Sequence, residues 1–190
     1  SFLLYLHRYT WNVIRPELQQ EYGFSNTMLE GLGTVFYATY AFGSIPSGVL
    51  IDLLGAHLVL VVIILVWSLT VPLQGITGNV WVLGAVRLLF GAAQTGAYPA
   101  LGQVTRNWFP RSSRTQVQGW VASFFGRGGG ALSSIIMATL LMGYLGLSWQ
   151  AALVVMAFPG VLFAVLFHAM FRNTPEDDPQ TNETERELIR

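Results

Sequence analysis

Long, nearly uncharged apolar stretches dominate this sequence and limit its possible folds more than any other feature. Of 190 residues, 53% are hydrophobic and only 11% are charged, against about 25% charged in a soluble domain. A helix needs about 20 predominantly apolar residues to cross a bilayer. The sequence therefore predicts an all-α membrane protein, a bundle of six transmembrane helices over residues 2–18, 28–51, 58–76, 80–104, 116–144 and 149–171. The span 58–76 is the most uniformly apolar, which favours the greatest lipid exposure.

The sequence divides into a transmembrane part, residues 1–171, and a polar tail, residues 172–190. The tail contains Pro175 and Pro179 and has no core-forming pattern. It also holds six of the ten acidic residues, namely Glu176, Asp177, Asp178, Glu183, Glu185 and Glu187. The first residue is Ser1 and the sequence opens inside an apolar run, so we interpret it as a fragment of a longer chain.

The distribution of arginine predicts the orientation in the membrane. Arg106, Arg111 and Arg114 lie in the predicted loop 105–115, on the same side as Arg172, whereas the opposite loops contain no Arg or Lys. Cytoplasmic loops carry the excess of Lys and Arg. We therefore expect a multi-pass plasma-membrane protein, with the bacterial inner membrane as the favoured location and both ends of this chain in the cytoplasm.

Three arginines, Arg8, Arg87 and Arg127, fall inside predicted spans. A cation at bilayer depth costs at least a few kcal/mol and usually faces a cavity or a partner. The four acids outside the tail (Glu17, Glu21, Glu30 and Asp52) map to helix ends or loops. Arginine is well shaped to bind a carboxylate or phosphate through two parallel hydrogen bonds. These arginines therefore indicate an anion site. Alternatively, Arg87 reaches the headgroups from the end of its span, and Arg127 caps a helix broken at neighbouring glycines.

Histidine supplies the one candidate for a proton relay. His7 is the only group deep in a predicted span that titrates near neutral pH; the alternative is a buried hydrogen-bonding residue. His57 and His168 fall at other predicted depths, so no shared histidine site is expected. With no paired carboxylates, metal-ligand spacing or Ser/His/Asp set, the sequence favours no enzyme, metal site, cofactor or nucleic-acid partner.

Four local strings follow one another along the chain at a characteristic spacing. They are residues 5–8 (YLHR) with Pro16 and 23–25; Phe36, Tyr40, Pro46 and 48–55 (GVLIDLLG); 87–100 (RLLFGAAQTGAYPA); and 108–114 (WFPRSSR). Together they resemble the major facilitator superfamily, and in particular its anion:cation symporter family. The tail from Thr174 resembles the start of that family's central loop.

The resemblance implies a twelve-helix transporter built from two six-helix halves, of which this chain is the amino-terminal half. Each half consists of two three-helix units in inverted orientation. The implied activity is secondary active transport of small organic anions, such as sugar acids or other carboxylates, by alternating access. The implied partners are the substrate anion, the lipid bilayer and a carboxy-terminal six-helix half.

Residue by residue, the resemblance implies three groups of functional positions. Arg8, Tyr40, Arg87 and Tyr37 would bind substrate. His7 and Gln94 occupy the coupling positions, where the family commonly has Asp and Glu. Asp52, with Gly48 and Gly55, would form part of the cytoplasmic gate.

The two replaced carboxylates leave the mode of transport open. Coupling through His7, exchange of one anion for another and facilitated movement all remain. The first-helix arginine and the string TPEDDP at 174–179 also resemble the organophosphate:phosphate antiporters of the same superfamily. A receptor built on a transporter half is a further alternative.

Overall fold

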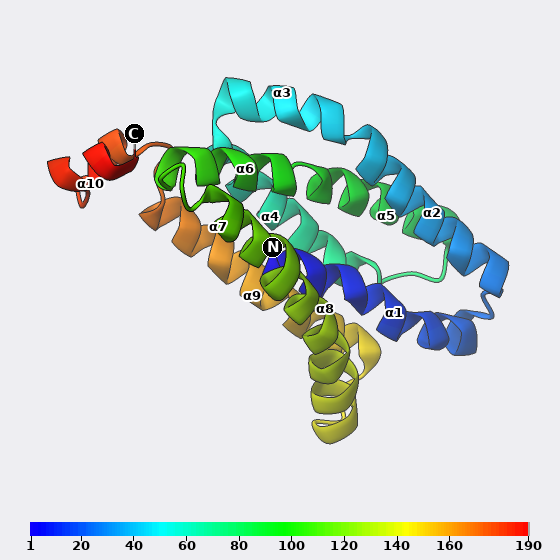
Figure 1. The fold of residues 1–190 in the computed structure, drawn as a ribbon. Coiled ribbons are helices and arrows are strands. Elements are labelled where there is room, and N and C mark those ends of the chain that lie inside the picture. Colours follow the sequence, from blue (N-terminus) through cyan, green and yellow to red (C-terminus); the bar gives the residue numbers. More distant parts are fainter. Residues whose placement is uncertain (190) are drawn as a thin grey trace.

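The computed structural model describes residues 1–189, and Arg190 of the predicted tail lies outside the described residues. The described part is helical and contains no strand (Figure 1). Short π-helical segments, η1 (Val121–Phe125) and η2 (Ile135–Tyr144), continue α7 and α8. The α-helices of the bundle are α1 (Phe2–Tyr22), α2 (Asn26–Phe42), α3 (Ser44–Leu54), α4 (Ala56–Leu73), α5 (Val80–Thr95), α6 (Ala97–Trp108), α7 (Arg114–Trp120), α8 (Gly126–Ser134) and α9 (Trp149–Met170).

Six helical segments follow the predicted order, but they differ in apolarity. Four are long and apolar enough to cross a membrane: Ala56–Leu73, Val80–Trp108, Arg114–Tyr144 and Trp149–Met170. The pair α2 and α3 meets the same standard as one span bent by 47°. Helix α1 has 21 residues, which is about the length needed. Its four charged residues (Arg8, Arg15, Glu17 and Glu21) make it more polar than the others.

Two of the predicted spans are interrupted at a glycine, and one of them is sharply bent there. The first breaks at Gly43, between α2 and α3, and the second at Gly96, between α5 and α6. The two breaks touch, because a Cβ atom at Gly43 would lie 2.8 Å from Cγ2 of Thr95. The Thr95 hydroxyl also donates a hydrogen bond to the carbonyl of Tyr40. The two interruptions are therefore packed against each other.

The helix contacts follow the pattern of an inverted repeat. Helix α1 packs on α8, α2 packs on α5, and α4 packs on α9. When the first three spans are matched in order to the last three, the contact of α1 with α8 corresponds to the contact of α5 with α2. The contact of α4 with α9 corresponds to itself. Both of the related pairs approach closely at glycine: a Cβ at Gly129 would lie 2.2 Å from the Phe2 carbonyl oxygen, and one at Gly91 would lie 2.6 Å from that of Phe36. Small residues allow such approach in membrane bundles.

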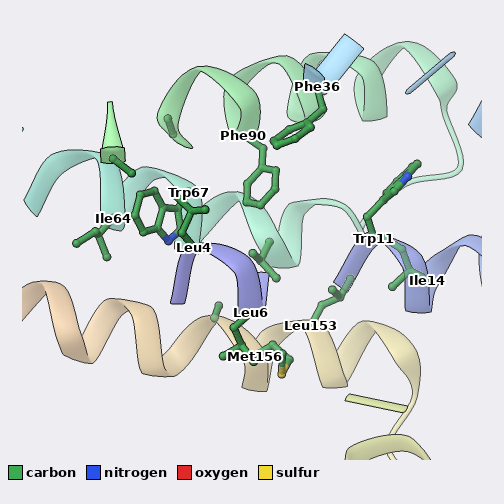
Figure 2. Packing of buried hydrophobic residues seen from close by; sticks show 14 of the residues in the cluster. Leu4, Leu6, Trp11, Ile14, Phe36, Ile64, Trp67, Phe90, Leu153 and Met156 are labelled. Atoms are coloured by element: carbon green, nitrogen blue, oxygen red, sulfur yellow. The ribbon is translucent and has the colours of Figure 1, made fainter. Parts of the chain in front are cut away.

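The buried core lies where α1, α4, α5 and α9 meet (Figure 2), and it includes Leu4, Trp67, Phe90 and Met156. The expectation that the third predicted span is the most lipid-exposed is wrong. Half of the apolar stretch of α4 is buried inside the bundle, whereas only 28% of that of α9 is buried. Helix α4 is uniformly apolar because helices cover it on several sides, chiefly α9 and α5.

The polar tail adds two short helices, η3 (Pro175–Asp177) and α10 (Glu183–Ile189). Asn182 begins α10 through a reciprocal cap. Its side-chain oxygen accepts the Glu185 backbone N–H at 2.9 Å, and the Glu185 carboxylate accepts the Asn182 N–H at 3.1 Å. Such a cap satisfies backbone donors that the helix itself leaves unpaired.

Candidate functional site

The guanidinium of Arg8 is surrounded by aromatic rings. Its central carbon lies 5.0 Å from the ring centroid of Tyr5, 5.3 Å from that of Phe36 and 4.6 Å from that of Tyr40. Tyr5 is one helical turn before Arg8, so the two share a face of α1, whereas Phe36 and Tyr40 come from α2. Ring faces stabilise a cation without neutralising its charge.

Gln94 holds this guanidinium in place. Arg8 Nε donates a 2.9 Å hydrogen bond to Gln94 Oε1, and Gln94 Nε2 donates at 3.1 Å to the carbonyl of Leu4. Arg8 Nη2 is buried and has no hydrogen-bond partner among the described residues. Arg8 is thus oriented by a neutral amide and keeps a donor and a full positive charge for a ligand.

Arg87 is a second buried cation, only 2% exposed. Its guanidinium lies 4.2 Å from the Trp11 ring centroid and 4.7 Å from that of Phe36. Arg87 Nε donates to the Leu32 carbonyl at 3.4 Å and Nη1 to Gln74 Oε1 at 3.5 Å. The alternative that Arg87 reaches out to the headgroups is therefore wrong, because the side chain is enclosed by α1 and α2. Phe36 contacts both cations.

A cleft of about 250 Å³ connects the two arginines with Tyr37, which is 61% exposed. Tyr9 and Asn12 of α1 also line this cleft. At one side of it, Arg15 and Glu30 form an ion pair. The predicted binding residues Arg8, Tyr37 and Arg87 therefore border one space, and Tyr40 stacks on the Arg8 side of it.

Several residues of this neighbourhood were not identified from the sequence. Tyr5 lies one helical turn before Arg8, so helical periodicity could have indicated it. Tyr9 directly follows Arg8 and is identified only by its place in the lining of the cleft. Tyr98, whose hydroxyl donates to the Tyr5 hydroxyl at 3.3 Å, comes from α6. Only the tertiary packing reveals Tyr98, on α6, and Gln74, which follows α4 and accepts from Arg87.

His7 lies away from this cleft. It is fully buried, and its Nε2 is 2.8 Å from the carbonyl oxygen of Met156 in α9. A carbonyl only accepts, so Nε2 carries a proton and donates. Nδ1 has no partner in the described part of the chain, and neither has the buried hydroxyl of Ser68. A Cβ at Gly160 would lie 2.5 Å from His7 Cε1 and 2.0 Å from Ser68 Oγ, so these groups are neighbours.

Two other expectations about polar residues are wrong. Arg127 does not cap a broken helix, because α8 continues through the glycines around it, and its side chain is exposed. The histidines at 57 and 168 do meet: their rings are stacked, with centroids 5.3 Å apart. His57 begins α4 and His168 lies near the end of α9, and these two ends lie on the same side of the bundle.

The predicted gate residues lie along α3 and just after it. Asp52 is exposed and lines a cleft of about 430 Å³ together with Gly48 and Arg106. A Cβ at Gly48 would meet nothing within 4 Å. Gly55 adopts a φ of 81°, which side chains rarely tolerate, and packs against Asn173. The side chain of Asn173 in turn accepts the His57 N–H at 2.8 Å.

An all-helical bundle with apolar spans, kinks at glycine and cations enclosed at depth is the architecture of a polytopic membrane protein. The family model described as Major Facilitator Superfamily matches residues 1–189. The chain belongs to the major facilitator superfamily, as the four local strings implied.

Curated relatives align with nearly all of the chain. It is 29% identical over 97% of its length to the "Probable galactarate/D-glucarate transporter GudP" of Bacillus subtilis (strain 168), of which it covers 41%. It is 27% identical over 98% of its length to the "Probable sulfoacetate transporter SauU" of Cupriavidus necator, covering 42%. The "Hexuronate transporter" of Bacillus subtilis is 28% identical over 91% of the chain and is covered to 40%. The chain thus spans about two fifths of these relatives.

Solved structures support the same fold. A bacterial homolog of the human lysosomal transporter Spinster, in an inward-facing and unoccupied conformation, superposes with a TM-score of 0.75 at 18% identity. The match covers 96% of this chain and 43% of that one.

Proposed function

We propose that this chain forms part of a secondary transporter for small organic anions such as sugar acids. The observation that carries the proposal is Arg8, with a buried Nη2 that has no partner in the described residues and a charge that no carboxylate neutralises. Holding such a group in a membrane is costly. An anionic substrate that enters the cleft would supply the missing partner.

The names of the relatives support the same class of cargo. Galactarate, glucarate, hexuronate and sulfoacetate are the substrates in the printed names of the three relatives described above. Each is a small organic acid. These names do not favour the alternative of an organophosphate:phosphate antiporter.

Within the site, Arg8 would grip the carboxylate of the substrate, and Tyr40 would orient it from the ring side. Tyr37 is exposed at the cleft and would contact the hydroxyl groups of a sugar acid. Arg87 is too enclosed for direct contact in this conformation, so its charge would attract the anion from behind Phe36.

Coupling would involve the two positions that the sequence singled out. Gln94 cannot bind or release a proton, so it would serve to position Arg8. His7 would take up a proton at Nδ1, next to Ser68, while Nε2 stays bonded to the Met156 carbonyl. Proton uptake would then occur in the core between α1, α4 and α9 rather than beside the substrate.

The remaining expectations concern the whole transporter. Asp52, with Gly48 and Gly55, would close the cytoplasmic entrance against a carboxy-terminal six-helix half. Gly48, which meets no neighbouring atom in the described part, would allow that close approach. The arginine-rich side would face the cytoplasm, with both ends of this chain there, in a bacterial inner membrane.

The test is transport by the full-length protein in proteoliposomes. We expect saturable uptake of labelled glucarate or galactarate, and counterflow driven by the unlabelled acid. Counterflow of labelled inorganic phosphate in the absence of sugar acid transport would instead support the phosphate exchanger. A protein that binds the acid but moves neither solute would be a receptor.

A further inference from the structure

A second cluster of cations lies far from Arg8, on the side of the bundle where α6, α7 and α9 have their loop or tail ends. There the tail and α10 lie beyond the ends of α6 and α9 (Figure 1). A cleft of about 240 Å³ lies between the α6–α7 connection and the tail. We call it the loop-side cleft, and its charged lining residues are Arg106, Arg111, Arg114, Arg186 and Glu176.

Two of the arginines of this cleft, Arg106 and Arg111, keep their guanidinium donors available, and the other two keep part of theirs. Arg106 and Arg111 are exposed, and no hydrogen bond or ion pair of either guanidinium occurs within residues 1–189. Arg114 is fixed by its bonds from Nε to the Phe109 carbonyl at 2.9 Å and from Nη2 to the Arg106 carbonyl at 2.8 Å, which leaves Nη1. Arg186 Nε is buried and has no partner in the described part of the chain.

Acidic residues are a minority of the charged groups that line this cleft. In the tail, the Asp177 carboxylate accepts the Thr174 hydroxyl at 2.8 Å, and the Asp178 carboxylate accepts the Gln180 N–H at 2.9 Å. Asp52 lies in the adjacent cleft, which shares Arg106. Among residues 1–189, Glu176 is the one carboxylate that lines the loop-side cleft, against four guanidinium groups. The cleft therefore carries excess positive charge.

We propose that the loop-side cleft binds a phosphate group, with Arg106 and Arg111 as its main ligands. A phosphate has several oxygens that accept from converging guanidinium groups, and arginine matches this geometry with paired donors. The phosphate comes either from an anionic phospholipid headgroup or from a free phosphate ion. The site is separate from the Arg8 cleft and does not depend on what that cleft transports.

The experiment uses the purified full-length protein and two probes. The first is inorganic phosphate, titrated by calorimetry into the protein in phosphatidylcholine nanodiscs. The second is phosphatidylglycerol, whose retention through detergent exchange is measured by native mass spectrometry. Arg106→Gln combined with Arg111→Gln removes the two main ligands. Arg172→Gln is the matched control, because Arg172 lies on the same side but donates to the Ala169 and Phe171 carbonyls.

We expect the double variant to weaken binding of one probe at least about tenfold, as for the loss of charge-assisted hydrogen bonds, and the Arg172 control to bind like the wild type. Binding of inorganic phosphate assigns the site to a free ion, and retention of phosphatidylglycerol alone assigns it to a lipid headgroup. Equal binding by the double variant and the wild type, or no binding of either probe, overturns the proposal. Unchanged thermal unfolding of the double variant verifies that its fold is intact.

Discussion

Arg8 and Gln94 are joined by a 2.9 Å hydrogen bond from the guanidinium Nε to the amide oxygen. The amide fixes the direction of the arginine and leaves its charge intact. A carboxylate at the same position would make the same hydrogen bond and would also cancel the charge. The identity of residue 94 therefore decides how strongly this site attracts an anion.

Gln94→Glu is expected to make uptake depend on acid pH. Above its pKa the new carboxylate would pair with Arg8 and compete with the substrate, and below its pKa the neutral acid would resemble the native amide. At neutral pH we expect substrate affinity to fall about tenfold, the size of one charged hydrogen bond, and to recover on acidification. The pH profile of the apparent KM for glucarate uptake measures this.

The matched control is Gln19→Glu, because Gln19 bonds to Asn26 at the exposed end of α1. Its pH profile should follow that of the wild type. A Gln94→Glu protein with wild-type affinity at every pH would show that Arg8 does not bind the substrate.

Arg8→Lys is expected to weaken substrate binding by about tenfold to a hundredfold. A lysine keeps the charge but loses the planar pair of donors and the hydrogen bond to Gln94. The quantity to measure is the KM for sugar acid uptake by the full-length protein. Arg15→Lys serves as control, since a point charge can still pair with Glu30, and an equal effect of both variants would contradict a specific role for Arg8.

His7→Gln is expected to abolish proton-driven accumulation and to spare exchange. A glutamine amide can still donate to the Met156 carbonyl, so the packing of α1 on α9 should survive, but it cannot carry a proton. Uptake under an imposed pH gradient is compared with counterflow in its absence. His57→Gln, at the start of α4 and away from His7, is the control. His7→Gln protein that still accumulates substrate would exclude His7 as the relay.

Gly129→Ala is expected to destabilise the bundle by about 2 kcal/mol, because overpacking of this kind costs about 1–3 kcal/mol. The added methyl group would meet the Phe2 backbone oxygen of α1, which cannot rotate away. Gly128→Ala is a close control, since a Cβ there meets nothing within 4 Å. Thermal unfolding of the purified full-length protein should show a lower midpoint for the first variant only.

The sequence allowed the helix order, the family and the enclosed arginines to be predicted, because each depends on apolar run length or on the rarity of charge in a membrane. The four acids outside the tail were expected at helix ends or in loops. Within residues 1–189, no carboxylate forms an ion pair with Arg8 or Arg87. The roles of Tyr40, Asp52 and His7 remain predictions.

Packing between distant segments could not be predicted from local pattern. The approach of His57 to His168 depends on two helices ending at the same level, and the enclosure of Arg87 depends on how Trp11 and Phe36 close over it. The lipid exposure of α4 was also wrong, since apolarity alone does not distinguish a lipid-facing helix from one covered by others.

The contact between Gly43 and Thr95 has a mechanical consequence. Because the interruption at Gly43 contacts Thr95, next to the interruption at Gly96, straightening α2 and α3 would press on the α5–α6 span. Helices α3 and α6, which follow the two interruptions and contact each other, would then move together. Asp52 lies on α3 and Arg106 on α6, so the predicted gate residue and a lining residue of the loop-side cleft would shift together.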